Sequence, residues 1–72
     1  MAITNDELEN WLTYHAPTDG QPEKYEAIRE AARSFARAIV KYTPPSADQT
    51  AAIRKIREAV MTANAAIACG GK

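Results

Sequence analysis

Apolar side chains recur every three or four residues along two stretches of this chain, residues 25–42 and 53–67. The positions are Tyr25, Ile28, Ala32, Phe35, Ile39 and Tyr42, followed by Ile53, Ile56, Val60, Ala63 and Ile67. Because this spacing follows the turn of an α-helix, it predicts two amphipathic helices. Pro44 and Pro45 interrupt the pattern between them. The chain is therefore predicted to be all-α and to contain one long antiparallel helical hairpin.

A shorter helix is predicted ahead of the hairpin, over about residues 4–14. Thr4 and Glu7 have the spacing of a capping box, in which the Thr4 side-chain oxygen accepts a hydrogen bond from the Glu7 amide. The helix should end near Tyr14, because Pro17 disfavours helical geometry in the residue before it.

The long helices are expected at about residues 22–42 and 46–68. Pro22 suits the first turn of the former, where its missing amide has no helical partner to lose. Ser46 and Gln49 form a second capping box at the start of the latter. Together the three helices make a single domain over residues 1–72.

Two helices cannot enclose a core, so each leaves much of its apolar surface in water. A chain of this size is expected to gain stability by associating with copies of itself. Apolar residues outside the main stripes, such as Val40 and Met61, also need a cover, which Trp11, Leu8 or a neighbouring chain could supply. Small residues at seven-residue intervals would let antiparallel helices approach closely; they are Ala31, Ala38, Ala52, Ala59 and Ala66. We therefore predict a homo-oligomer.

Charge and cysteine content narrow the class of protein. Nine basic and nine acidic side chains cancel, which argues against a nucleic-acid polymer as partner. The single cysteine, Cys69, excludes an internal disulfide and suits a reducing cytoplasm. The sequence also shows no apolar run of transmembrane length and no secretory signal. We expect a soluble intracellular protein with no membrane partner.

Catalytic chemistry has little support in the sequence. One histidine and one cysteine lie far apart, and no acidic cluster has the spacing of metal ligands. The three glycines do not form a phosphate-binding loop. The chain is therefore not expected to be an enzyme, to bind a metal or to need a cofactor.

Tyr14 and His15 follow the predicted short helix and precede a proline turn. An aromatic ring in such a place can stack on a base or another ring-shaped ligand. The alternative is structural: Tyr14 packs against the hairpin and His15 caps the end of the helix.

Basic residues recur every four positions on the first long helix, at Arg29, Arg33, Arg37 and Lys41. Like charges at this spacing repel weakly, so the series does not serve helix stability. An arginine beside the apolar stripe, such as Arg29, would be duplicated across a symmetric interface and could grip a ligand with two phosphates. The alternative is a solvated face paired with Glu26 and Glu30. A second basic cluster, Arg54, Lys55 and Arg57, is expected to form solvated ion pairs with Asp48 and Glu58.

The order of these segments resembles the helical-hairpin domain of phage anti-CBASS sponges, which is shared with a group of anti-Thoeris sponges. The segments that carry the resemblance are Tyr14-His15-Ala16-Pro17, Gln21-Pro22-Glu23-Lys24-Tyr25-Glu26-Ala27-Ile28-Arg29, Pro44-Pro45-Ser46 and Glu58-Ala59-Val60-Met61-Thr62-Ala63-Asn64-Ala65-Ala66-Ile67-Ala68. The combination of the first and last segments is specific, whereas neither alone would be.

The resemblance implies a small phage protein in the cytoplasm of an infected bacterial host. Members of the family assemble, commonly as hexamers, and bind cyclic oligonucleotide messengers between protomers without cleaving them, so that the CBASS effector stays inactive. Their ligands include cyclic dinucleotides such as cyclic GMP-AMP and, in some members, cyclic trinucleotides in a separate pocket. A Thoeris-type cyclic ADP-ribose signal is the other ligand class that the resemblance allows.

The resemblance also implies roles for particular residues. An aromatic residue stacks on bases, here Tyr14, and a basic residue contacts phosphate, here Arg29. The full set of expected ligand-binding residues is Tyr14, His15, Gln21, Tyr25, Arg29 and Arg33. Cys69 stands where family members often carry a basic residue, which weakens the case for a trinucleotide pocket.

Three other functions fit parts of the sequence. A helical adaptor would bind a protein partner through Met61, Val40 and Trp11. A nucleic-acid binder would use the two basic clusters, although the net charge of zero opposes it. A hydrolase of the same messengers would need a metal site or a second catalytic group that the sequence lacks.

Overall fold

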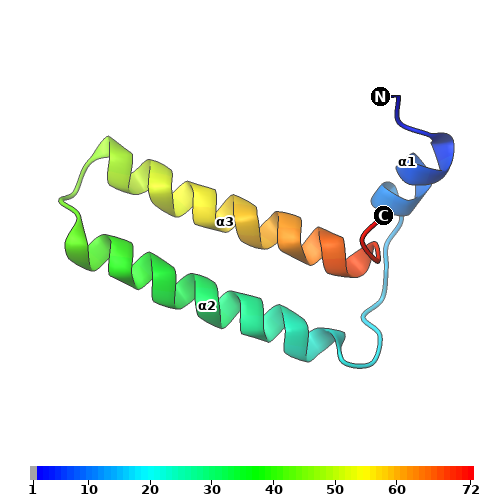
Figure 1. The fold of residues 1–72 in the computed structure, drawn as a ribbon, viewed down its shortest axis with the longest axis horizontal. Coiled ribbons are helices and arrows are strands. Elements are labelled where there is room, and N and C mark those ends of the chain that lie inside the picture. Colours follow the sequence, from blue (N-terminus) through cyan, green and yellow to red (C-terminus); the bar gives the residue numbers. More distant parts are fainter. Residues whose placement is uncertain (1) are drawn as a thin grey trace.

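The computed structural model describes residues 2–72 and contains three α-helices with no strand in that range. They are α1 (Asn5–Leu12), α2 (Gln21–Tyr42) and α3 (Ala47–Ala68). Figure 1 shows α2 and α3 side by side and running in opposite directions, with α1 beyond the end of α3 and next to the C-terminus. The all-α prediction is confirmed. We refer to α2 and α3 together as the helix pair.

The beginnings of α1 and α3 follow from their capping residues. The Thr4 hydroxyl oxygen accepts from the Glu7 amide at 3.1 Å, and the Ser46 hydroxyl oxygen accepts from the Gln49 amide at the same distance. Gln49 also donates from its side chain to the Thr43 carbonyl at 3.2 Å, which ties the start of α3 to the end of α2. These bonds satisfy amides that have no partner inside a helix.

The first helix ends at Leu12, two residues before the predicted Tyr14. If α1 continued, the Tyr14 amide would donate to the Asn10 carbonyl. That carbonyl is instead 2.6 Å from Nε2 of His15 and 3.8 Å from Sγ of Cys69. The His15 ring therefore caps the helix, and the chain leaves it extended at Thr13.

The last turn of α3 ends in two glycines. The Gly71 amide donates to the Ala66 carbonyl at 2.9 Å and the Gly70 amide to the Ile67 carbonyl at 3.3 Å. This is the pattern of a Schellman motif, and the φ angle of 67° at Gly70 is one that a side chain would strain. The motif turns the C-terminal residues back toward α1.

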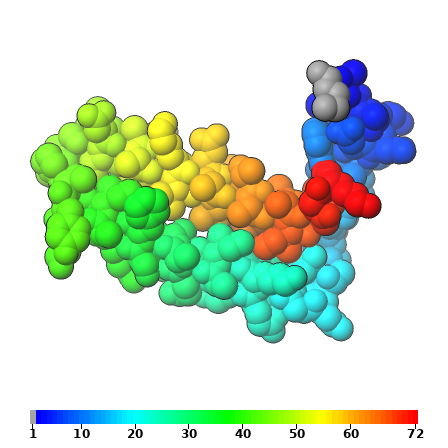
Figure 2. Space-filling view, in the orientation of Figure 1, coloured from blue at the N-terminus to red at the C-terminus, as the bar shows by residue number. Residues whose placement is uncertain are grey.

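Residues 2–72 have an open shape without an enclosed core. No residue in the range 2–72 is buried, and the apolar residues along the helix pair are half-buried at most. The radius of gyration is 15.4 Å, whereas a compact chain of this length would have about 11 Å. The accessible surface of 5908 Å² likewise exceeds the roughly 4,400 Å² expected for a compact monomer of this mass. Figure 2 shows α1 projecting at one end, so that it leaves the length of the helix pair uncovered.

Candidate functional site

The helix pair carries a hollow along each side of the line where α2 and α3 meet. Three residues, Ala32, Ile56 and Val60, line both hollows and form the seam between them. The two hollows share no other lining residue. On each helix, the side chains that line one hollow point to one side of the seam, and those that line the other hollow point to the other side. The two hollows therefore lie on opposite sides of the same seam.

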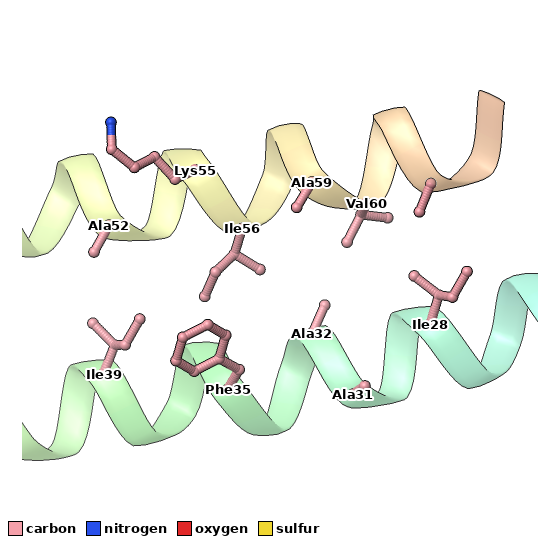
Figure 3. Close-up of a pocket in the computed structure, with 11 residues that line it drawn as sticks. Ile28, Ala31, Ala32, Phe35, Ile39, Ala52, Lys55, Ile56, Ala59 and Val60 are labelled. Carbon is pink, nitrogen blue, oxygen red and sulfur yellow. The ribbon is translucent and has the colours of Figure 1, made fainter. Parts of the chain in front are cut away.

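The first hollow, which we call the apolar groove, has a volume of about 550 Å³. Besides the seam, it is lined by Ile28, Ala31, Phe35, Ile39, Ala52, Lys55, Ala59 and Ala63. Figure 3 shows Phe35 and Ile56 pointing toward each other across the gap, while the Lys55 amine points away from it. Phe35 is 60% exposed. The groove is thus an exposed apolar surface that is lined in part by alanines.

The second hollow, which we call the arginine groove, has a volume of about 370 Å³. Besides the seam, it is lined by Arg29, Arg33 and Ala36 from α2, and by Ile53, Arg57 and Met61 from α3. Three arginines, from both helices, thus line a hollow whose other lining residues are apolar. Such a surface suits an anionic ligand that also carries an apolar part.

Glutamates on α2 partly neutralise two of these arginines. The Glu26 carboxylate lies 3.3 Å from Arg29 and 3.7 Å from Arg33, and Arg33 also pairs with Glu30. The side chains are about half exposed, so these ion pairs add little to stability. The alternative prediction for the basic row of α2 was a solvated face paired with glutamates. Such pairs are present at Arg29 and Arg33.

The ion pairs predicted for the second basic cluster are not formed. Within residues 2–72, neither Asp48 nor Glu58 pairs with Arg54, Lys55 or Arg57, so that prediction is wrong. Part of the reason is the order of the charges. Each glutamate on α2 precedes its arginine, which favours pairing, whereas Glu58 follows the basic residues of α3, which does not.

The segment between α1 and α2 carries the aromatic candidate. Tyr14 is 83% exposed, the highest value for a large apolar side chain in residues 2–72. His15 contacts Asn10 as described above, and Gln21 bridges two elements. Oε1 of Gln21 accepts from the Thr18 amide at 3.0 Å, and its Nε2 donates to the Ile67 carbonyl at 3.3 Å. Gln21 thus ties the segment to the end of α3 and His15 ties it to α1, while Tyr14 projects into solvent.

The expected ligand-binding residues are therefore only partly brought together in one chain. Gln21, Tyr25, Arg29 and Arg33 follow one another along a strip of α2, about 6 Å apart. Of the six residues, Arg29 and Arg33 line the arginine groove, and Tyr14 and His15 do not. Sequence analysis did not single out Arg57 as a residue of this groove. Its position four residues after Ile53 and four before Met61 on α3 was the available signal.

Two further findings concern the range 2–72. None of the three helices combines the length and apolarity needed to cross a membrane. The same range contains no group of three or more histidine, cysteine, aspartate or glutamate residues that could hold a metal ion.

These features define a small all-α protein with an arginine-lined groove and a large uncovered apolar surface. Residues 4–68 match the family model described as "Acb2/Tad1, hairpin domain", and the chain belongs to this family. The resemblance to the anti-CBASS and anti-Thoeris sponges is thereby confirmed. No curated protein and no solved structure matches the chain. The family is known for binding cyclic oligonucleotides, so membership is consistent with a sponge and suggests a binding protein without catalysis.

Proposed function

We propose that this protein is a sponge that binds a cyclic dinucleotide, such as cyclic GMP-AMP, between the protomers of a homo-oligomer. It holds the messenger without cleaving it, in the cytoplasm of an infected bacterium, and so keeps the CBASS effector inactive. The observation that carries the proposal is the family match over residues 4–68.

The proposed assembly accounts for the open shape of the single chain. The accessible surface of 5908 Å² is larger than that of a compact monomer by roughly 1,500 Å². A standard interface buries about 800 Å² on each partner, so the surplus is close to the area of two interfaces per chain. Two interfaces per chain are what a closed assembly larger than a dimer needs, and a hexamer is one such assembly.

A second copy of the chain is the proposed occupant of the apolar groove. Phe35 supplies a large apolar side chain to the interface, and the walls at Ala31 and Ala59 allow a helix to approach closely. The copy would cover the most extended apolar surface on the helix pair.

The ligand site is proposed to use residues duplicated by a twofold axis. Two Tyr14 rings would stack on the two bases, and two Arg29 guanidinium groups would bind the two phosphates. Stacking contributes about 1–3 kcal/mol per base, and a charge-assisted hydrogen bond contributes roughly 1.5–3 kcal/mol. In this arrangement Arg33 adds positive charge one turn from Arg29, and Tyr25 lies one turn before it. His15 and Gln21 act through the segment that presents Tyr14.

The family description names Tad1 beside Acb2. A Thoeris-type cyclic ADP-ribose signal is therefore the second candidate ligand. It shares with the cyclic dinucleotide a closed ring with phosphates and a base, so the same arginines and tyrosine would serve it.

The proposal is tested by titration calorimetry of the purified protein with cyclic GMP-AMP, with the linear dinucleotide as control. We expect tight binding of the cyclic form alone, at a ratio of ligand to chain below one if protomers share a site. No binding of cyclic GMP-AMP together with binding of a cyclic ADP-ribose would move the proposal to the second ligand. Absence of binding to either class would contradict the sponge and favour the adaptor.

The residue assignments are tested with Tyr14→Ala and Arg29→Ala. Each should weaken binding by about 10- to 100-fold, because each removes a contact to base or phosphate. Arg37→Ala is the matched control for Arg29→Ala, since Arg37 belongs to the same row but lines neither groove. Unchanged affinity in both test variants, with unchanged oligomeric mass, would refute the assignments.

A further inference from the structure

Arg57 is the one arginine from α3 among the residues that line the arginine groove. We infer that Arg57 binds a phosphate of the cyclic dinucleotide from α3, on the opposite side of the groove from Arg29 and Arg33. The inference rests on the proposed function and adds a residue and a second helix to its ligand site.

The position of Arg57 supports this role. Ile53, Arg57 and Met61 follow one another at intervals of four residues, so they share one side of α3. All three line the arginine groove together with Arg29 and Arg33 from α2. The volume of about 370 Å³ lies within the range of roughly 300–1,000 Å³ that is usual for small-molecule sites. A ligand in this groove would therefore touch both helices of one protomer.

Arg57 differs from Arg29 and Arg33 in having no carboxylate partner in the part of the chain that the structure describes. Arg29 and Arg33 pair with Glu26, and Arg33 pairs also with Glu30. Arg57 has no ion pair in the part of the chain that the structure describes. The two carboxylates therefore compensate the charge of the arginines on α2 but not that of Arg57. An anion in the groove would supply the opposite charge that Arg57 lacks.

The remaining lining residues fit a nucleotide better than a simple anion. The floor is apolar, formed by Ile53, Ile56 and Val60, and Met61 beside it is 60% exposed. A thioether and aliphatic side chains can pack against the flat face of a base. The guanidinium forks at the rim can bind phosphate oxygens through two parallel hydrogen bonds. The groove thus combines the two recognition elements that a cyclic dinucleotide requires.

The test compares Arg57→Ala with Arg54→Ala in calorimetric titrations with cyclic GMP-AMP. Both variants remove one positive charge from the same stretch of α3, but Arg54 lines neither groove. We expect Arg57→Ala to weaken binding by about 10- to 100-fold and Arg54→Ala to change it by less than about 3-fold. Light scattering and circular dichroism should show the wild-type oligomeric mass and helix content for both.

A third variant, Arg57→Lys, keeps the charge but loses the fork, and should bind with an affinity between those of Arg57→Ala and the wild type. Equal small effects of Arg57→Ala and Arg54→Ala would overturn the inference and leave the proposed function intact, provided that the wild type binds. A changed mass in both Arg57 variants would also overturn it, because Arg57 would then act through assembly. A wild-type protein that binds no cyclic dinucleotide would overturn both the inference and the proposed function.

Discussion

The apolar groove and the arginine groove share the seam residues Ala32, Ile56 and Val60, yet they present different chemistry. On one side the lining is aliphatic and aromatic, with a single lysine whose amine points away. On the other side the lining contains three arginines among apolar residues. Because the described residues enclose no core, each side of the seam is exposed to solvent in the single chain. In the proposed assembly, one side of the helix pair would meet a second copy, and the other would contribute arginines to the ligand site between protomers.

The largest effect is expected from placing a charge in the apolar groove. In Phe35→Asp an unpaired carboxylate would be buried between copies, which costs about 3 kcal/mol or more. We therefore expect the assembly to dissociate at micromolar concentration, measured as a loss of mass by light scattering. Ser34→Asp is the matched control, because it adds the same group at the residue before Phe35, and Ser34 lines neither groove. Retention of the full mass by Phe35→Asp would show that copies do not meet at this groove.

One substitution in each groove tests whether the two grooves have separate functions. Ala59→Leu adds bulk to the apolar groove and should weaken assembly by about 1–3 kcal/mol through overpacking. Ala36→Leu adds the same bulk to the arginine groove and should lower the affinity for cyclic GMP-AMP by about 10-fold. Sedimentation velocity measures the first property and calorimetry the second. If both variants alter the same property, the two grooves do not have separate functions.

The smallest effect is expected from the carboxylate beside the arginine groove. In Glu26→Gln the negative charge that pairs with Arg29 and Arg33 is removed, while the length of the side chain is kept. Because this carboxylate repels a phosphate, its loss should tighten binding by about 2- to 5-fold. Calorimetry at two salt concentrations measures the change, with Glu23→Gln as control in the first turn of α2. Weaker binding by Glu26→Gln would show instead that Glu26 holds the two arginines in place.

Much of the fold could be predicted from the sequence because its signals are local. The three-residue spacings at Thr4 and Ser46 predicted where α1 and α3 begin, and the amides at Glu7 and Gln49 make the expected bonds. The end of α1 was predicted only in part, because the sequence offered His15 as a cap but did not place the end of the helix at Leu12. It depends on the His15 ring reaching the Asn10 carbonyl and on the nearby Cys69 thiol, and the latter lies at the far end of the sequence.

Less of the candidate site than of the fold could be predicted from the sequence. The row containing Arg29 and Arg33 was visible on α2, because residues four apart share a side of a helix. Arg57 lines the same groove only because of how α2 and α3 are aligned across the seam. The residue pattern of one helix does not determine that alignment. The relation of Tyr14 to the arginines is proposed to arise between copies, and no pattern within one chain describes it.

The bonds that hold α1 have a consequence for how this protein can change. The Asn10 side chain donates to the Cys69 carbonyl at 3.3 Å, and the Trp11 indole donates to the Lys72 carbonyl at 2.8 Å. Both acceptors are backbone atoms beyond the last turn of α3, so the placement of Tyr14 depends on the path of the C-terminal residues more than on their side chains. Mutations that reroute this tail would shift Tyr14 while the helix pair stays the same. Ligand preference and assembly could then diverge independently among related proteins.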